Sequence, residues 1–354
     1  MRVLHLPTVI GGNAWALSRA ERYNGVKSDV LVTGTSIFSD KYDILLSRPK
    51  SKVLYALKIA RFYMEATKKY DVFHFNFGTS LVTSRLALLN MIDLEYLRHK
   101  KKAIFVTYQG SDARLPSYCW RNYEYTYFDE DDVKASVQNE IYKERNKRKF
   151  DKYANFIYTT NPDLLNVLPR RTKFRPYTKL DLDDWRFDSY SDYGKEELII
   201  GHAPSNRKVK GTAYVVKAVE ELQKEGFPIR LLLIEGIPNS EVRSFYRQAD
   251  LFVDQLLVGW YGGLSVEVMS LGKPVIVYLR HEDLVGIPNE MREDLPFINA
   301  NPRTIFQTLK HCYVERASLS ERAMLSRRFV EKWHNSNEIA RSVIEDYKRA
   351  LEQV

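Results

Sequence analysis

The chain has 354 residues, enough for about two globular domains that each bury a core. Apolar residues make up 44% of it and charged residues 28%, a balance typical of folded rather than disordered proteins. No apolar run approaches the roughly 18 residues of a membrane-spanning helix, so the sequence predicts no transmembrane helix. The net charge of +9 favours anionic partners such as nucleotides or phospholipid surfaces. Because no zinc-ligand set or RNA-binding strand motif accompanies that charge, we expect no nucleic-acid partner.

The N-terminus and the two cysteines bear on location and metal content. The opening MRVLHLPTVIGG lacks the long apolar core of a signal peptide. Cys119 and Cys312 lie far apart and have no metal-ligand spacing. We therefore expect a reduced, cytoplasmic setting and no bound metal.

The first part of the chain alternates strand and helix patterns. Residues 1–9 predict a strand, and Gly11-Gly12-Asn13 then open a helix, a unit typical of the start of a nucleotide-binding α/β domain. The third glycine of the full dinucleotide fingerprint is missing. Further strands are predicted at 29–33, 71–75, 103–107 and 156–160, and helices at 54–67, 84–97 and 129–153.

Polar side chains cluster at the carboxyl ends of two of these strands. Ligands of open α/β sheets bind outside such ends, which makes these side chains candidates for a site. They are His74, Asn76, Gln109, Ser111 and Asp112. Asp112 is the first candidate for touching a substrate, although a role in a turn or helix cap fits it equally well. A lone histidine after a strand, such as His74, is more often a structural hydrogen bonder.

Basic and aromatic segments leave alternatives open. The helix at 54–67 suits either a membrane surface or, by our preference, a crossover packed on the sheet. Residues 50–69 and the basic run 99–102 also suit peripheral docking on anionic lipid. The aromatic segment 117–128 suits an acceptor molecule or the cover of a core edge, and we favour the cover.

An irregular segment separates this part from a second α/β pattern. The expected division is residues 1–180 for the first domain, 181–197 for a linker, 198–330 for the second domain and 331–354 for a closing helix. Asp181-Leu182-Asp183 resembles a metal-binding pair. A charged linker is the stronger interpretation, because no other ligand cluster accompanies it.

From residue 198 strands and helices alternate again, which predicts a second doubly wound domain. Its first strand leads into a basic loop, 205–211, that carries Arg207 and Lys210. Later strands are predicted at 229–234 and 249–254, and helices at 212–224 and 240–247.

The stretch 258–277 combines a glycine-rich turn, a helix at 264–271 ended by Gly272, and a buried strand from Pro274. Such a turn before a helix offers free backbone N–H groups and a positive dipole end to an anion. Glu267, one turn inside the helix, suits a sugar hydroxyl of the same ligand. A helix that only packs fits the stretch, taken alone, equally well.

Both loops follow parallel strands, so we expect them at one sheet edge, facing a cleft between the domains. The residues brought together would be Arg207, Lys210, Gly262, Gly263 and Leu264. Two cations and a row of N–H groups suit a nucleoside diphosphate held without a metal, and they would stabilise a leaving diphosphate. Trp260 and Tyr261 in the turn are expected to contact this ligand rather than only to wall the cleft.

Several of these motifs resemble those of GT-B glycosyltransferases of family 4. The run GGLSVEVMSLGKPVI, from Gly262 to Ile276, resembles the signature in which a glycine turn precedes Glu-Ala-Met-Ala and Gly-x-Pro-Val. Gly11-Gly12, the run 108–112 (YQGSD) and Lys210-Gly211 match further family loops in order. The resemblance implies the GT-B fold: two Rossmann-like domains facing a cleft, with a C-terminal helix crossing back to the first, acceptor-binding domain.

The resemblance also implies a retaining, metal-independent hexosyltransferase of polysaccharide biosynthesis without further cofactors. It would move a sugar from a UDP- or GDP-type donor to a glycan or lipid-linked acceptor. By position, Glu267 would hold the ribose hydroxyls, and Gly263 and Leu264 would donate backbone N–H groups to the diphosphate. Lys210, with Arg207 in place of the family's arginine, would neutralise it.

On the acceptor side, Gly12 would lie near the phosphate or the acceptor. Retaining front-face transfer needs no strong base when the leaving phosphate takes the acceptor's proton. The catalytic candidates are Asp112, Gln109 and His74.

The chain departs from the family at three positions. Gly259 stands eight residues before Glu267, where a glutamate usually contacts the donor sugar. Gln109 replaces the family's histidine, and His202 stands where arginine is common. These departures keep open a non-catalytic nucleotide-sugar or glycan-binding partner of an active transferase. A sugar-phosphate epimerase on the same fold is a weaker alternative.

Overall fold

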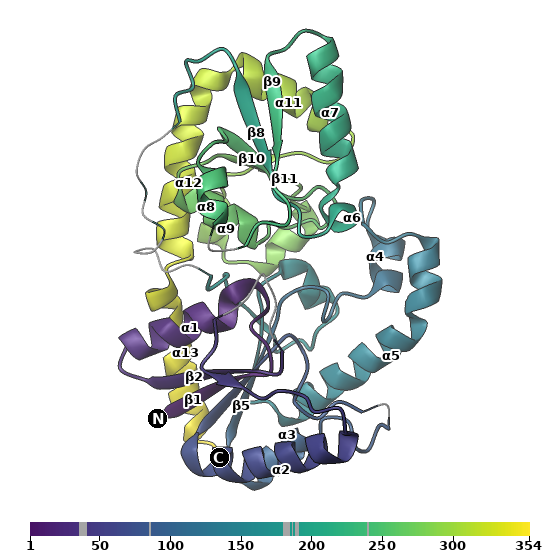
Figure 1. Ribbon diagram of the computed structural model, residues 1–354, viewed down its shortest axis with the longest axis vertical. Coiled ribbons are helices and arrows are strands. Elements are labelled where there is room, and N and C mark those ends of the chain that lie inside the picture. Colours follow the sequence, from purple (N-terminus) through teal and green to yellow (C-terminus); the bar gives the residue numbers. More distant parts are fainter. Residues whose placement is uncertain (35–40, 85, 180–184, 186, 188–190, 239–240) are drawn as a thin grey trace. The chain divides into compact units, whose positions relative to one another are not determined.

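The computed structural model describes every residue except 35–40, 85, 180–184, 186, 188–190 and 239–240. The chain divides into two compact units (Figure 1). Unit 1 comprises Met1–Tyr118, Glu130–Lys179 and Ser336–Val354, and unit 2 comprises Cys119–Asp129 and Leu180–Asn335. Each unit is built on one parallel sheet, so the prediction of an α/β chain with two doubly wound domains is confirmed.

Unit 1 contains a seven-stranded parallel sheet with the order β3-β2-β1-β4-β5-β6-β7. Its inner strands are rich in β-branched and aromatic residues and are buried on both faces, as parallel sheets require. The order reverses between β1 and β4, which is the position where doubly wound sheets bind ligands. The strands are β1 (Arg2–Leu6), β2 (Lys27–Val32), β3 (Ile44–Leu45), β4 (Val72–Asn76), β5 (Ala103–Tyr108), β6 (Phe156–Thr159) and β7 (Lys173–Phe174).

Helices cover both faces of this sheet (Figure 1). On one face the rings of Phe105 and Tyr347 meet edge to face at 4.6 Å, and on the other Phe75 meets Phe150 at 5.5 Å. The first face is covered by α1 (Asn13–Tyr23) and α13 (Ser336–Leu351), and the second by α2 (Lys52–Lys69), α3 (Ile92–His99) and α5 (Glu130–Tyr153). The short 3-10 helices of this unit are η1 (Ile10–Gly12) and η2 (Pro162–Asn166).

Unit 2 contains a five-stranded parallel sheet with the order β12-β11-β10-β8-β9. The strands are β8 (Leu198–His202), β9 (Ile229–Leu233), β10 (Leu251–Val253), β11 (Val275–Val277) and β12 (Ile298–Asn299). The helices are α6 (Arg207–Lys210), α7 (Thr212–Lys224), α8 (Val242–Tyr246), α9 (Gly263–Ser270), α10 (Asn289–Glu293), α11 (Ile305–Val314) and α12 (Leu319–Trp333), with the 3-10 helices η3 (His281–Gly286) and η4 (Arg316–Ser318). α9 ends where expected, because Gly272 adopts the left-handed conformation, φ 67°, that closes a helix.

The helix expected at 84–97 is wrong in its first half. The observed helix, α3, begins only at Ile92, and Met91 before it is left-handed with φ 55°. The Met91 N–H donates to the Val82 carbonyl, which closes a turn instead of a helix. Several leucines of 86–89 are exposed, so the apolar spacing in this segment does not reflect a core-facing side.

The aromatic segment 117–128, which lies inside the expected first domain, is divided between the two observed units. The helix α4 (Pro116–Asn122) begins in unit 1, but residues 119–129 cluster with unit 2 rather than with the first domain. The cause is local: the Arg280 guanidinium lies 3.4 Å from the ring centroid of Tyr123, and Arg303 pairs with Glu124 at 3.0 Å.

Two expectations concern parts that the structure does not place. Asp181-Leu182-Asp183 and much of the expected linker lie outside the described residues.

In the part that is described, the longest and most apolar helical segments fall short of what crossing a bilayer demands.

A buried polar network holds α13 against the other elements of unit 1. The Tyr347 hydroxyl donates to a Glu21 carboxylate oxygen at 2.9 Å and lies 2.6 Å from His74 Nδ1. His74 Nε2 lies 2.8 Å from the Thr107 hydroxyl. Burial, with the neighbouring His5 and Arg175, lowers the pKa of His74 well below its usual value, so the ring is neutral at neutral pH.

We expect Tyr347→Phe to lower the free energy of unfolding by about 1–3 kcal/mol, because the buried Glu21 carboxylate loses a donor. Tyr214→Phe removes the same hydroxyl from an exposed position and serves as the matched control. Chemical denaturation of both variants measures the difference. Equal, negligible changes would show that the network does not hold α13.

Candidate functional site

Two loops of unit 2 meet at the point where its strand order reverses. The chain goes from β8 to β9 on one side of the sheet and then returns to β10 on the other side of β8. Doubly wound sheets of this order bind ligands at the carboxyl ends of the two strands that flank this point. The loop after β8 contains α6, and the loop after β10 runs from Asp254 to the start of α9.

The start of α9 offers backbone donors. The helix begins at Gly263, after an extended Gly262, and the Ser265 N–H donates to the Gly262 carbonyl at 3.1 Å. Among the described residues, neither the Gly263 nor the Leu264 N–H has a hydrogen-bond acceptor. The positive end of the helix dipole adds to these two free N–H groups, so the position suits an anion.

A buried carboxylate, Asp254, organises the site. It accepts hydrogen bonds from the Gly262 N–H at 2.6 Å and the Ser265 hydroxyl at 2.7 Å, and it pairs with Lys210 Nζ at 2.6 Å. Burial opposes ionisation, but Lys210 and the other donors outweigh it, and the pKa of Asp254 is lowered. Lys210 also donates to the Gln255 side-chain oxygen at 2.7 Å, so both loops are joined through its ammonium group.

Gly262 is required by this packing. A Cβ at this position would lie 2.8 Å from Lys210 Nζ and 3.1 Å from an Asp254 carboxylate oxygen. No side chain fits without moving the ion pair. The glycine therefore lets Lys210 approach the start of α9.

Arg207 lies at the same sheet edge but on the surface. Its guanidinium makes two hydrogen bonds to Glu235, one of them from Nε at 2.8 Å. The hydrogen bond from Arg207 is the main cause of the lowered pKa of Glu235. Solvent screens this exposed pair, so the arginine can exchange its carboxylate for another anion at little cost.

Glu267 is buried one turn inside α9. The Tyr246 hydroxyl donates to its Oε2 at 3.3 Å. Burial, together with the nearby Glu267 charge, raises the pKa of Tyr246, which stays a neutral donor. The Tyr246 hydroxyl therefore helps to hold the carboxylate in place.

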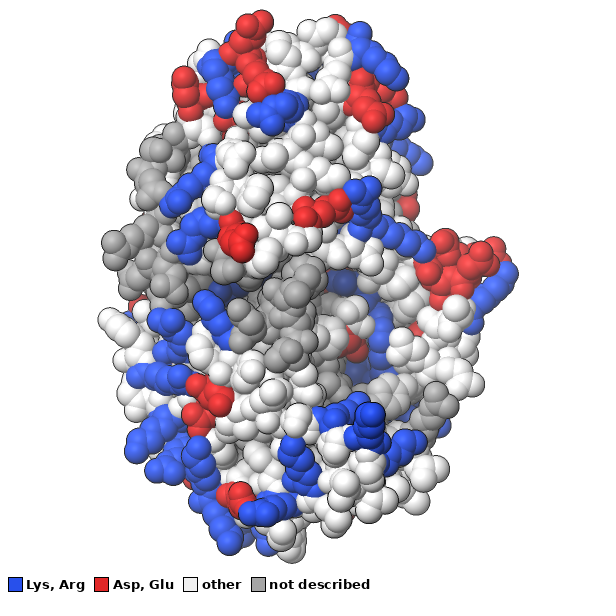
Figure 2. All heavy atoms as spheres, in the orientation of Figure 1, with Lys and Arg blue, Asp and Glu red and all other residues white. Residues whose placement is uncertain are grey.

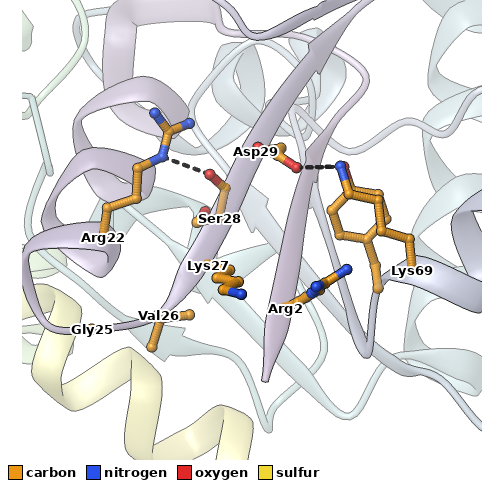
Figure 3. Close-up of a pocket in the computed structure, with 9 residues that line it drawn as sticks. Arg2, Arg22, Gly25, Val26, Lys27, Ser28, Asp29 and Lys69 are labelled. Carbon is orange, nitrogen blue, oxygen red and sulfur yellow. Dashed lines mark hydrogen bonds and ion pairs between the residues drawn. The ribbon is translucent and has the colours of Figure 1, made fainter.

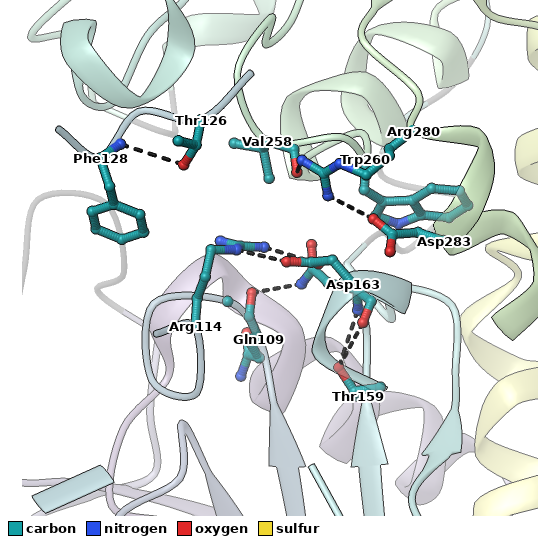
Figure 4. A network of polar contacts seen from close by, with 12 residues as sticks. Gln109, Arg114, Thr126, Phe128, Thr159, Asp163, Val258, Trp260, Arg280 and Asp283 are labelled. Carbon is teal, nitrogen blue, oxygen red and sulfur yellow. Dashed lines mark hydrogen bonds and ion pairs between the residues drawn. The ribbon is translucent and has the colours of Figure 1, made fainter. Parts of the chain in front are cut away.

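The side chain of Arg280, which points to Asp283 and the Val258 carbonyl in Figure 4, packs against Gly259. Gly259 is left-handed, φ 88°, and a Cβ there would lie 2.6 Å from Arg280 Cζ. Arg280 donates to Asp283 at 2.6 Å and to the Val258 carbonyl at 3.2 Å. A cation paired with an aspartate thus fills the region next to Gly259, where the family resemblance leads one to expect a glutamate.

Trp260 and Tyr261 do not fit the ligand contact expected of them. Both side chains are fully buried. Tyr261 stacks on Phe297 at 4.7 Å, and its hydroxyl lies 2.9 Å from His334 Nε2. The two rings anchor the turn in the core of unit 2, because a glycine-rich turn has no side chains of its own to pack.

In unit 1, two of the expected site loops come together. Gly12 is left-handed with φ 75° at the start of α1, and the next residue, Asn13, donates to Gln109 Oε1 at 2.8 Å. The Asn161 side-chain amide donates to the Gln109 carbonyl at 2.7 Å. Gln109 Nε2 is buried and has no acceptor among the described residues. Gly12 and Gln109 therefore share one sheet edge, as expected.

Asp112 holds the loop after β5. Its carboxylate accepts from the Gln109 N–H at 3.1 Å and the Gly110 N–H at 2.7 Å. Burial raises the pKa of Asp112 to about 6, although these N–H donors oppose the shift. The nearby Arg114 is engaged elsewhere, in a two-point pair with Asp163 at 2.7 and 3.0 Å (Figure 4).

The structure gives His74 a structural role instead of the catalytic one expected. The side chain is fully buried, and its two ring nitrogens are occupied by Tyr347 and Thr107. His202 in unit 2 is similar: it contacts the Val253 carbonyl at 2.7 Å and the Thr212 hydroxyl at 2.9 Å. Neither ring has a nitrogen left for a ligand.

Sequence reasoning missed the central carboxylate, Asp254. The sequence pattern makes it the last residue of a predicted strand. The rule that polar side chains at the carboxyl ends of strands are site candidates applies to it as well. Arg280 had no sequence signal, because its proximity to Gly259 arises only when β10 and β11 pair.

No protein-family model and no curated protein matches the chain. Solved structures do. Sucrose-phosphate synthase from Thermosynechococcus elongatus is 15% identical with a TM-score of 0.64, covering 100% of this chain and 99% of that one. HepE from Anabaena, in complex with UDP and glucose, is 12% identical with a TM-score of 0.62 over 99% and 100%. WaaG, a glycosyltransferase involved in lipopolysaccharide biosynthesis, is 10% identical with a TM-score of 0.58 over 97% and 99%. These likenesses show the fold, which is GT-B.

We expect Asp254→Asn to lower the free energy of unfolding by about 3–5 kcal/mol, because it leaves Lys210 buried without a counter-charge. Glu235→Gln makes the same chemical change in the exposed pair with Arg207 and should leave stability unchanged. Urea unfolding of both variants measures the contrast. Similar effects of the two changes would contradict the organising role of Asp254.

Asp112 should give stability a defined pH dependence. Its pKa in the folded protein, about 6, exceeds the ordinary 3.8, so the folded chain holds this proton more tightly than the unfolded chain. Its contribution to stability is therefore fully present below pH 3.8 and is lost as the pH rises towards 6. Asp112→Asn should abolish that slope in unfolding free energy measured against pH. A slope that survives the substitution belongs to another group.

Proposed function

We propose that the protein is a glycosyltransferase that moves a sugar from a nucleotide-sugar donor, of UDP or GDP type, to a glycan or lipid-linked acceptor. In the proposed reaction the sugar keeps its anomeric configuration and no metal is required. The acceptor would belong to polysaccharide biosynthesis, on the cytoplasmic side of a membrane that the protein contacts peripherally.

The observation that carries this proposal is the start of α9 with its cation. The N–H groups of Gly263 and Leu264 lack acceptors among the described residues, and Lys210 lies next to Gly262. A diphosphate is the common ligand that needs several donors and a positive charge at one point. Asp254 neutralises part of the Lys210 charge. The attraction for a diphosphate therefore comes from the backbone N–H groups and the helix dipole as much as from charged side chains.

Glu267 extends the site towards the nucleoside. Its buried carboxylate follows the free N–H groups by one turn of α9. A ribose hydroxyl pair presents two donors that such a carboxylate can accept. We therefore assign Glu267 to the ribose, with Tyr246 holding it in place.

The proposed chemistry places the developing charge on the diphosphate. The bond between the anomeric carbon and the diphosphate oxygen breaks, the acceptor oxygen bonds to the same face of that carbon, and the acceptor proton passes to the leaving phosphate. Fixed N–H groups and Lys210 stabilise the charge that grows on the leaving group. Because the leaving phosphate accepts the proton, the reaction does not need the histidine that the family has at the position of Gln109.

Unit 1 would supply the acceptor contacts. Gln109 presents a buried amide donor, and the Asp112 carboxylate, with a pKa of about 6, is ionised at neutral pH and can accept from an acceptor hydroxyl. Gly12 leaves open space at the same sheet edge, since no atom lies within 4 Å of where its Cβ would be.

What is known of two structural neighbours supports this choice. HepE was solved with UDP and glucose, and WaaG acts in lipopolysaccharide biosynthesis. Both contain the GT-B fold that this chain has. A sugar donor and a surface glycan as product are therefore the first chemistry to test.

A second candidate is a non-catalytic nucleotide-sugar-binding partner of an active transferase. The observation that favours it is Arg280, which fills the region beside Gly259 where a sugar-contacting carboxylate is expected. Such a protein would bind the donor through the same α9 site and release no nucleotide.

The test is a transfer and donor-hydrolysis assay with UDP-, GDP- and TDP-sugars, combined with calorimetric binding of the nucleoside diphosphates. We expect nucleotide release with one donor class. Glu267→Gln should weaken binding of that diphosphate by about 1.5–3 kcal/mol, the value of a hydrogen bond to a charged group. Glu220→Gln, an exposed change of the same kind, is the control. Binding without release from any donor would favour the non-catalytic partner, and no binding at all would exclude both.

A further inference from the structure

The helix α2 has an apolar face that unit 1 does not use. Its inner face packs on the sheet through Ile59, Tyr63 and Ala66, which are buried in the core. On the opposite side Val53, Leu57 and Met64 are 69%, 62% and 56% exposed. Spacings of four and seven residues place these three side chains in one line along the helix. A helix that only crosses over a sheet needs one apolar face, and α2 has two.

Cations accompany the exposed line. α2 carries five lysine or arginine residues and one glutamate. Lys52 and Lys68, near its two ends, are exposed and make no ion pair within the described part of the chain. Arg61 pairs only with the exposed Glu65, at 3.1 Å. Figure 2 shows lysine and arginine side chains spread among uncharged atoms over the surface that α2 forms, with few acidic groups between them.

A second exposed apolar group lies beside the helix. Leu86, Leu88, Leu89 and Ile92 precede α3 or begin it, and Leu88 is 87% exposed. The Tyr63 hydroxyl of α2 donates to Asp93 at 2.5 Å, and the Tyr63 and Tyr96 rings contact at 6.3 Å. These bonds hold the start of α3 against the middle of α2. The exposed leucines thus enlarge the apolar surface in the same part of unit 1.

The end of α2 borders a basic hollow (Figure 3). This cavity of about 570 Å³ is lined in part by Arg2, Lys27 and Lys69. Lys69 is bound to Asp29 at 2.9 Å, whereas the side chains of Arg2 and Lys27 have no ion-pair partner among the described residues. A phosphate group would complete the charge balance of the hollow.

We propose that unit 1 docks on an anionic phospholipid surface through the outer face of α2. Val53, Leu57 and Met64 would enter the boundary between headgroups and acyl chains, and Arg61 and Lys68, which lie on the same side of the helix, would contact lipid phosphates. The surface combines the two features that interfacial binding requires, an apolar line and cations beside it. A protein partner of acidic character would match the charges, but a line of flexible aliphatic side chains with cations beside it suits a fluid surface better than a fixed one.

This docking rests on the peripheral membrane contact of the proposed function and gives it a surface, but it does not depend on sugar transfer, since no residue of α2 belongs to the proposed site. A binding-only protein would dock in the same way. The docking and the sugar transfer are therefore tested by separate experiments. Assays with a soluble donor test the α9 site, and flotation with vesicles in the absence of donor tests the membrane contact of α2.

The experiment is flotation of the full chain with phosphatidylcholine vesicles, with and without phosphatidylglycerol, at low and high salt. We expect binding only to the anionic vesicles, with a loss at high salt because the lysine contacts are screened. The double variant L57Q and M64Q should reduce the partition coefficient by roughly 100-fold, about tenfold for each apolar side chain. R61E with K68E should reduce it by at least about fivefold per cation.

Matched controls come from unit 2. V285Q with V314Q changes two exposed valines, and K217E with K224E changes two exposed lysines of α7. Both controls should float like the unchanged protein. Failure of the unchanged protein to float on anionic vesicles at low salt would overturn the proposal. Equal losses in the α2 variants and the controls would also overturn it, as would a dimer in light scattering that L57Q and M64Q dissociate while flotation is absent.

Discussion

The buried pair of Lys210 and Asp254 is the interaction on which the candidate site depends. The carboxylate holds the lysine, the N–H of Gly262 and the hydroxyl of Ser265 with three short contacts. These contacts join the loop after β8 to the start of α9 at the reversal of strand order. Since a buried charge is costly without its partner, neither side chain can leave without disrupting the other. The N–H groups of Gly263 and Leu264, which have no acceptor within the described part of the chain, are therefore presented by a rigid frame.

The same pair shapes the electrostatics of the site. A lysine already matched by a carboxylate contributes less net charge than an unpaired one, and Arg207 is matched by Glu235 on the surface. The positive character left for a ligand comes largely from N–H groups and the helix dipole. Arg280, paired with Asp283 beside Gly259, adds donors where a carboxylate was expected. The site thus favours acceptor-rich anions over cations throughout.

The sequence was informative where the physical signal is local, and uninformative where tertiary pairing decides. Alternating apolar strands and helices predicted both parallel sheets, and Gly272 marked the end of α9. The segment 84–97 misled because the leucines of 86–89 fit a helical pattern while they face solvent. Trp260 and Tyr261 were assigned to a ligand from their place in a turn, yet they anchor that turn in the core. The contacts of Asp254 with Lys210, and of Gly259 with Arg280, join residues far apart in sequence, so only the folded chain reveals them.

The central claim is that a diphosphate binds to the N–H groups at the start of α9. The most direct measurement is a titration of the glycine- and leucine-labelled protein with UDP and with GDP, followed by the amide resonances of Gly263 and Leu264. The account predicts large, saturable shifts of these two amides with at least one nucleotide, together with a smaller shift of Gly262, whose N–H is already bound to Asp254. Saturable binding that leaves Gly263 and Leu264 unchanged would contradict it.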